Sequence, residues 1–187
     1  MFKTLDKPLR LAFNIAALAL IIVAIIRAFA PYLGGHDPRE TEIRVTIAHI
    51  LSGDAADIPA LLEGQPSMLV VYASWCGPCR VEMPRIANLL REGRLKHIRP
   101  LFLSLDKEPR ALAIYLVHHD YHTLFTPYLL TSKNSEVVLK ALIATGSGFS
   151  GAIPYIGFFD ARGKITTEFF GIPSDEELLQ VVNKLQK

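Results

Sequence analysis

The chain has 187 residues, of which half are hydrophobic, and its formal net charge is +2. This length suits one domain of ordinary size with an appendage, and the apolar content is ample for a buried core. The small charge and the lack of a long basic run argue against nucleic acid as a partner.

The first predicted element is an apolar segment from Leu11 to Ile26, which contains no charged side chain and follows a basic flank that ends at Arg10. As a helix it spans about 24 Å, and apolar neighbours extend it toward the roughly 30 Å of a bilayer core. The basic flank favours a cytoplasmic N-terminus. We therefore predict a cytoplasmic n-region over residues 1–10 and a transmembrane signal anchor over residues 11–30.

A cleaved signal peptide is the alternative, because Ala28, Phe29 and Ala30 resemble a peptidase cleavage site. Pro31 would directly follow the cut, where we expect it to hinder the peptidase. The apolar run is also long for a signal peptide, so its length favours an uncleaved anchor. In either case the rest of the chain is predicted to be exported.

Residues 31–42 contain glycines, prolines and mixed charges, which predicts a linker before a domain over residues 43–187. The first part of this domain, residues 43–47, alternates apolar and polar side chains and is predicted to be an edge strand. A short helix over residues 52–63 and a buried strand over residues 68–73 are expected to follow.

The central motif comes next and reads Trp75-Cys76-Gly77-Pro78-Cys79-Arg80. It opens a predicted helix over residues 76–91. A thiol in the first turn of a helix faces unpaired N–H groups and the positive end of the helix dipole, and both stabilise the thiolate. Gly77 and Pro78 suit the tight entry into the helix. We expect Cys76 to be the exposed attacking thiol and Cys79 the buried thiol that resolves the mixed disulfide.

A structural zinc site is the alternative use of a Cys-x-x-Cys pair. Such a site needs about four ligands, whereas this chain has only two cysteines. His118 and His122 have the i, i+4 spacing of a metal-binding pair, but a histidine-rich exposed helix end is far commoner. We therefore expect redox chemistry and no bound metal.

The rest of the domain is predicted to alternate strands and helices, and then to end in a hairpin and a last helix. The expected elements are a strand over 98–105, a helix over 109–119, a strand or extended loop over 125–130, a helix over 135–144, a loop over 146–151, and hairpin strands over 155–159 and 164–170. Ser174 and Glu177 form a capping-box pattern, which predicts the start of the last helix.

The motif from Trp75 to Arg80 resembles the active site of the thioredoxins. Its continuation through Glu82 and Pro84 resembles the membrane-anchored thioredoxin-like reductases of bacterial cytochrome c maturation, the TlpA/ResA type. The resemblance implies an α/β thioredoxin fold, with a central mixed sheet flanked by helices. The residues expected to shape the active site are Trp75, Gly77, Pro78 and Pro154.

In that fold a cis-proline precedes a strand and lies beside the cysteine pair, and the Ile153–Pro154 bond is expected to take this place. The backbone of Ile153 would then pair with an extended segment of the substrate. Trp75 and Pro154 are also expected to contact the substrate. An ordinary trans proline at the start of an edge strand is the alternative.

Glu82 lies three positions after Cys79, so the two side chains should project from the same side of the helix. In the reductases that this chain resembles, an acid at this place tunes the thiols and moves protons. Cytoplasmic thioredoxins carry a buried aspartate where this chain has Val70, which makes Glu82 the natural substitute. The alternative is a surface glutamate that pairs with Arg85.

These features predict a disulfide reductase in the bacterial inner membrane, with a single membrane span and its thioredoxin-like domain in the periplasm. The expected substrate is an exported protein such as apocytochrome c, or another protein with metal-site cysteines. Electrons would come from a membrane thiol donor, because no nucleotide-binding motif is present and no cofactor is expected. Two alternatives stay open: a disulfide oxidase or isomerase of secreted proteins, and a redox-inactive module for docking or copper delivery.

Overall fold

The computed structural model describes residues 15–27 and 37–186. Contacts divide the chain into two compact units, Met1–Glu40 and Thr41–Lys187. The second unit contains the β-sheet and both cysteines.

In the first unit, residues 15–27 form a helix with exposed side chains. Within the described ranges, no helix is both long and apolar enough to cross a membrane. The two ends of the predicted anchor, residues 11–14 and 28–30, lie outside the described residues. The predicted n-region lies outside them too, and so do residues 31–36 of the predicted linker.

The second unit is built on a five-stranded mixed sheet in the order β3-β2-β1-β4-β5. The strands are β1 Ser67–Tyr72, β2 Arg99–Ser104, β3 Tyr128–Leu129, β4 Tyr155–Phe159 and β5 Ile165–Phe170. β1 pairs in parallel with β2, and β2 with β3, whereas β4 and β5 are antiparallel to their neighbours. All residues of β1 are buried, as expected for the central strand of a sheet covered on both faces.

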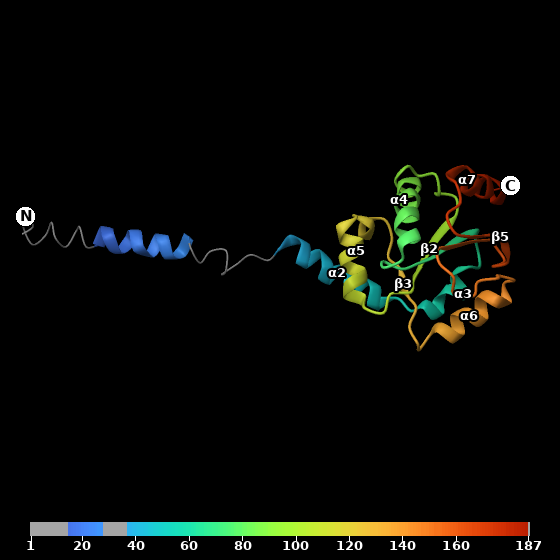
Figure 1. The fold of residues 1–187 in the computed structure, drawn as a ribbon, viewed down its shortest axis with the longest axis horizontal. Coiled ribbons are helices and arrows are strands. Elements are labelled where there is room, and N and C mark those ends of the chain that lie inside the picture. The colour runs from blue at the N-terminus through green and yellow to red at the C-terminus, as the bar shows by residue number, and fades with distance from the viewer. Residues whose placement is uncertain (1–14, 28–36, 187) are drawn as a thin grey trace, which may run out of the picture. The chain divides into compact units, whose positions relative to one another are not determined.

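Helices cover both faces of this sheet. They are α2 Pro38–Ser52, α3 Ile58–Leu61, α4 Gly77–Arg91, α5 Pro109–His118, α6 Ser135–Ala144 and α7 Asp175–Leu185, with short 3₁₀ turns at Ala55–Asp57 and Tyr121–Thr123. Figure 1 shows α4 and α7 on one side of the sheet and α3 and α6 on the other. The predicted α/β thioredoxin fold, with a mixed sheet between helices, is confirmed.

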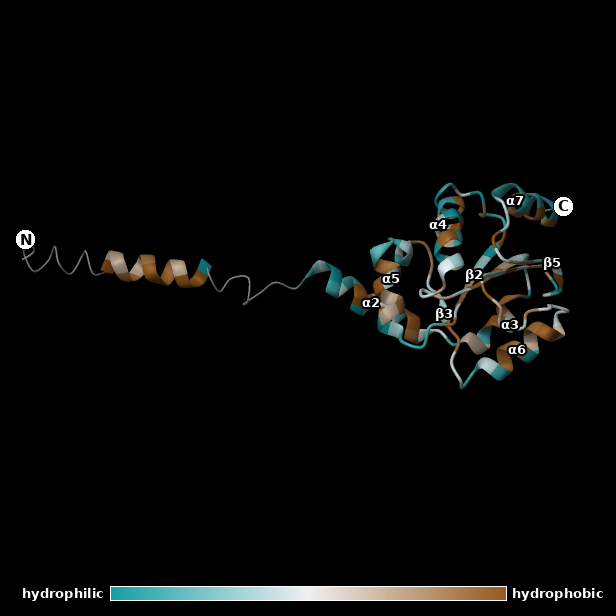
Figure 2. Cartoon of the chain, in the orientation of Figure 1, coloured by the Kyte–Doolittle hydropathy of each residue, from teal (hydrophilic) through white to brown (hydrophobic). Residues whose placement is uncertain are grey.

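Alternate residues of β1 enter the two halves of the core, because successive side chains of a strand point to opposite faces. Met68 and Val70 join the cluster that contains α4, α5 and α7, together with both cysteines. Leu69 and Val71 join the cluster under α3 and α6. In Figure 2, α7 shows its hydrophilic side outward and its hydrophobic side toward the sheet. The cysteine pair therefore belongs to the α4 side of the core.

The predicted edge strand over residues 43–47 is wrong, because this segment lies inside α2. Pro38 begins the helix, and the Asp37 carboxylate accepts a hydrogen bond from the Arg39 N–H at 3.0 Å. The buried residues Thr46 and Ile50 are four positions apart, which is the helical spacing. Five alternating residues are too short a window to separate the two periods. The end of the predicted linker, from residue 38, also belongs to this helix.

Downstream, the order of elements agrees with the prediction. Residues 125–130 were predicted to be either a strand or an extended loop. Within them, Tyr128 and Leu129 pair with β2 and form the short parallel strand β3. Gly163 has a φ of 73° in the hairpin turn, the left-handed region that favours glycine. The Ser174–Glu177 capping box is present at the start of α7.

Candidate functional site: a disulfide at the start of a helix

The cysteine pair lies where the chain leaves β1 and enters α4. The Cys76 N–H donates to the Ala73 carbonyl at 3.1 Å and closes a turn directly before the helix. Cys76 is the N-cap of α4, and its Sγ accepts a hydrogen bond from the Cys79 N–H at 3.2 Å. Pro78 occupies the first turn, where its missing N–H is not needed. The sulfur of Cys76 is therefore held at the positive end of the helix dipole.

Cys76 and Cys79 form a disulfide, with their Cα atoms 5.2 Å apart. Cys76 is 6% exposed and Cys79 is fully buried. Cys76 is thus the more accessible residue of the pair, but the expectation that it is exposed is not met in this disulfide form. Trp75 is 66% exposed directly before it, and Gly77 and Pro78 are exposed after it.

The Ile153–Pro154 bond is cis, as expected. It directly precedes β4, whose first residue, Tyr155, pairs with Val71 near the end of β1. Because the two strands are antiparallel, the start of β4 and the end of β1 lie at the same edge of the sheet. Ile153 is partly buried and packs against both core clusters. The topology therefore brings the proline and the cysteine motif to one edge.

Glu82 is buried, at 1% exposure, on the inner side of α4. Neither carboxylate oxygen has a hydrogen-bond partner among the described residues. Burial raises the pKa of Glu82 from 4.5 to about 7, although the positive charge of Arg85 opposes the shift. Arg85 itself pairs with Asp175 at 2.6 Å. The alternative of a surface glutamate is therefore wrong.

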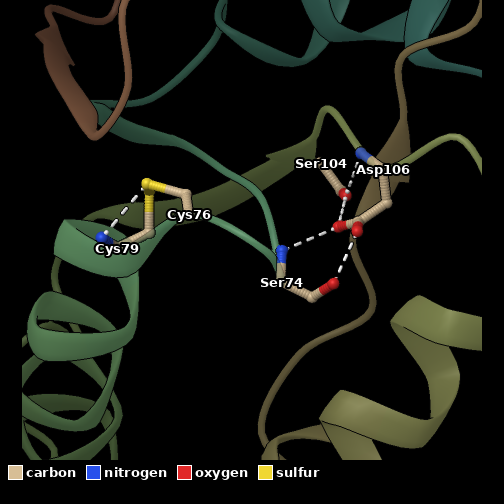
Figure 3. The surroundings of a disulfide bond; sticks show 5 residues. All are labelled: Ser74, Cys76, Cys79, Ser104 and Asp106. Carbon is tan, nitrogen blue, oxygen red and sulfur yellow. Dashed lines mark hydrogen bonds between the residues drawn. A yellow bond between two sulfur atoms is a disulfide. The ribbon is translucent and has the colours of Figure 1, made fainter.

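A second buried carboxylate, Asp106, lies beside the motif and was given no role by the sequence analysis. Its Oδ2 accepts from the Ser74 N–H at 2.9 Å and its Oδ1 from the Ser74 hydroxyl at 2.6 Å. The Ser104 hydroxyl donates to Oδ2 at 2.7 Å. Figure 3 shows this group of three residues next to the disulfide. The sequence signal was a serine and an aspartate at the end of a buried strand, but nothing in it identified Ser74 as their partner.

The histidines that were weighed as metal ligands lie on α5 and the turn that follows it. The His118 and His119 rings are in contact, with their centres 4.9 Å apart, and His119 stacks on Tyr121. Among the described residues, no group of three or more His, Cys, Asp or Glu side chains is placed to hold a metal ion.

Comparison with known proteins places the fold and the motif in a family. Residues 51–168, more than half of the chain, match the AhpC/TSA family. The chain belongs to the AhpC/TSA family. This match supports the resemblance to thioredoxin-like proteins that the motif indicated.

Named relatives of this AhpC/TSA-family chain are thiol–disulfide exchange proteins. The thiol–disulfide oxidoreductase ResA of Oceanobacillus iheyensis is 34% identical over 76 residues, which are 41% of this chain and 38% of ResA. The thiol:disulfide interchange protein DsbE of Pseudomonas fluorescens biotype C is 28% identical over 120 residues, which are 64% of this chain and 60% of DsbE. The aligned part is thus less than two thirds of either relative.

Solved structures support the fold. A thiol:disulfide interchange protein of the thioredoxin family from Chlorobium tepidum TLS superimposes with a TM-score of 0.54 at 18% identity, over 68% of this chain and 84% of that one. The thioredoxin domain of an oxidoreductase from Bacteroides vulgatus gives a TM-score of 0.53 at 18% identity, over 68% and 84%. At this identity the similarity concerns the fold alone.

Proposed function

We propose that the chain is an extracytoplasmic thiol–disulfide oxidoreductase that reduces disulfides in exported proteins. The observation that carries this proposal is the Cys76–Cys79 pair at the start of α4, with the buried carboxylate of Glu82 on the same helix. The names of the ResA and DsbE relatives support the class of reaction.

In the proposed reaction, the Cys76 thiolate attacks one sulfur of a partner disulfide, forms a mixed disulfide and releases a partner thiolate. Cys79 then loses its proton and attacks the Cys76 sulfur, which forms the Cys76–Cys79 disulfide and releases the second partner thiolate. Two electrons thus pass to the partner, and its two thiolates take up two protons. A dithiol donor restores the cysteine pair by the reverse exchange.

Glu82 is the proposed base for the resolving step. A pKa of about 7 makes a carboxylate an effective proton acceptor near neutral pH. Glu82 and Cys79 are three positions apart on α4 and both face the core. Val70 is fully buried in the same cluster as the cysteines, so the aspartate of cytoplasmic thioredoxins has no counterpart at that position.

The proposed substrate surface combines exposed Trp75 with the segment at Ile153 and Pro154. Trp75 offers an apolar contact, and the backbone of Ile153 can pair with an extended segment of the partner. From the resemblance to the TlpA/ResA type, we propose apocytochrome c, or a protein whose metal-site cysteines must be reduced, as the substrate class.

We also propose that residues 11–30 anchor the protein in the bacterial inner membrane, with the thioredoxin-like domain in the periplasm. The support is the uncharged apolar run from Leu11 to Ile26 and the basic flank before it. A membrane thiol protein would then supply the electrons.

The reduction potential of the full chain in detergent, titrated with glutathione or dithiothreitol, tests the direction of the reaction. We expect a value near the roughly −270 mV of thioredoxin, which has the same Gly-Pro between its cysteines. A value near the about −120 mV of strong periplasmic oxidants would instead make the protein a disulfide donor.

Cys76→Ser should abolish reduction of a model disulfide, and turnover by this variant would refute the mechanism. Stoichiometric copper binding without any disulfide exchange by the unmodified chain would favour the redox-inactive module.

A further inference from the structure

We propose that Asp106 is a positioning residue for the nucleophile: through Ser74 it fixes the turn that places Cys76 at the start of α4. The inference rests on the proposed function in one respect, since that proposal makes Cys76 the attacking thiol. It adds a residue far from the motif in sequence, which holds the motif from the loop that follows the neighbouring strand β2.

Asp106 is a buried carboxylate of which both oxygens accept hydrogen bonds. Asp106 is 3% exposed, and its two oxygens accept three hydrogen bonds from Ser74 and Ser104. The Asp106 N–H in turn donates to the Ser104 hydroxyl at 3.0 Å. A buried charge is tolerated when hydrogen bonds of this kind satisfy it, and bonds to a charged group are among the strongest in proteins.

The group joins the ends of the two central strands. Tyr72 and Ser104, the last residues of β1 and β2, are partners in the parallel ladder, and beyond them the ladder gives way to loops. Just after the ladder ends, the Asp106 carboxylate accepts hydrogen bonds from both the N–H and the hydroxyl of Ser74. Ser74 is the second residue of the turn that the Cys76 N–H closes onto Ala73. The carboxylate therefore fixes the inside of the turn that ends at the nucleophile.

The hydrogen bonds between Asp106 and Ser74 become important for the position of Cys76 once the disulfide is reduced. In the disulfide form, the bond to Cys79 holds the Cys76 sulfur in place. In the dithiol form that bond is absent, and the position of Cys76 depends on the turn and on the helix start. The thiolate is stabilised by the N-terminus of α4 only if Sγ stays near the Cys79 N–H, which is 3.2 Å away in the disulfide form. A looser turn therefore weakens that stabilisation and lowers the fraction of reactive thiolate.

The role differs from that of a proton acceptor. Both oxygens of Asp106 are already occupied by donors, and Figure 3 shows the carboxylate directed at Ser74 and Ser104 rather than at the sulfurs. Asp106 acts on Cys76 through its hydrogen bonds to the N–H and the hydroxyl of Ser74, so its effect should depend on these bonds and not only on its charge.

Ser74→Ala removes the hydroxyl bond to Oδ1 and leaves the charge of Asp106 and its bond to the Ser74 N–H in place. The matched control is Ser67→Ala, at the other end of β1, where a buried serine donates to the Gln65 carbonyl at 3.0 Å. Each variant loses one hydrogen bond donated by a serine hydroxyl at or just beyond an end of β1. Ser74→Thr keeps a hydroxyl and should restore most of the wild-type behaviour.

The readout is the pH dependence of iodoacetamide alkylation of Cys76 in the reduced full chain in detergent, together with the thermal midpoint. We expect Ser74→Ala to raise the pKa of Cys76 and to slow its alkylation near neutral pH by about threefold. A change of this size lies within the range expected for the loss of one hydrogen bond. Ser67→Ala should leave the pKa and the alkylation rate of Cys76 at their wild-type values. Its thermal midpoint should fall about as much as that of Ser74→Ala.

A Ser74→Ala variant that alkylates like wild type, or a Ser67→Ala variant that is slowed equally, would overturn the proposal and leave the group a purely structural one. If Ser74→Ala does not fold, Ser74→Thr decides, because it must then match wild type. Alkylation needs no partner disulfide, so this test is separate from the proposed function. A wild-type chain that reduces no disulfide would refute that function, while the alkylation profiles would still decide the role of Asp106.

Discussion

Glu82 and Asp106 are both buried carboxylates beside one cysteine motif, but their surroundings differ. The oxygens of Asp106 accept three hydrogen bonds, whereas those of Glu82 have no partner among the described residues. Hydrogen bonds to the charged form offset the loss of solvation, and without them burial favours the protonated acid. A hydrogen-bonded carboxylate is suited to hold a loop in place. A carboxylate without such bonds is suited to accept and release a proton. In the proposed mechanism, Asp106 therefore has the positioning role and Glu82 the proton-transfer role.

The sharpest test of this comparison exchanges carboxyl for amide at Glu82 and follows stability with pH. Glu82 has a pKa of about 7 in the folded protein and 4.5 ordinarily. Below pH 4.5 it is protonated in both states, and this contribution to stability is fully present. As pH rises to about 7, the unfolded chain releases the proton first, and the wild type loses stability. The loss should reach about 3 kcal/mol.

Glu82→Gln cannot titrate, so it should be spared this loss. We expect its free energy of unfolding, relative to wild type, to rise by about 3 kcal/mol between pH 4.5 and 7.5 and then to level off. Urea denaturation of the oxidised proteins across this pH range measures the difference. A difference that stays constant with pH would show that Glu82 is not a titrating buried acid.

The same exchange at Asp106 should have the opposite sign. An amide offers one accepting oxygen and turns an NH₂ group toward a serine donor, so Asp106→Asn should destabilise the oxidised protein by about 2 kcal/mol at neutral pH. The control is Asp54→Asn, because Asp54 also accepts from a backbone N–H and from the Asn134 amide, both at 3.0 Å, but is exposed.

Urea denaturation compares the two aspartate variants directly. We expect a clearly smaller loss for Asp54→Asn, since water replaces its bonds. Equal losses would mean that burial gives the Asp106 bonds no special weight.

The two carboxylates also differ in how far sequence could predict them. Glu82 follows Cys79 by three residues, and helical spacing alone places both on one side of α4. Asp106 reaches Ser74 across 32 residues, and that contact depends on the pairing of β1 with β2. Local patterns carry no information on such a partner. The sequence therefore predicted the acid on the helix that the cysteine motif begins and missed the acid in the loop after the neighbouring strand.

The fold shows a similar difference between elements with a strong local sequence pattern and a segment whose pattern is too short to decide. The buried run of β1, the cap at Ser174 and the helix over 135–144 have strong local patterns, and the structure has them where predicted. The segment 43–47 is ambiguous because five residues fit both a strand and a helix. Its helical state follows from packing, since Ile50 is buried against the core on the α4 side of the sheet.

The smallest expected effect concerns Arg85, which connects Glu82 to the surface. The positive charge of Arg85 lowers the pKa of Glu82, against the larger effect of burial. Arg85→Gln should therefore raise that pKa above about 7. It also removes a partly exposed ion pair with Asp175, whose side chains are 31% and 49% exposed, so the loss of stability should stay below about 1 kcal/mol. An NMR titration of the Glu82 carboxyl measures the shift.

Asp175→Asn is the matched control, because it breaks the same ion pair and keeps the guanidinium charge. It should not raise the pKa of Glu82, since the charge that favours the carboxylate remains and loses its competing partner. If both variants raise the pKa equally, Arg85 acts by holding α4 and α7 together rather than by its charge. If neither changes it, the pKa of Glu82 is set by burial alone, and the contrast with the hydrogen-bonded Asp106 is then complete.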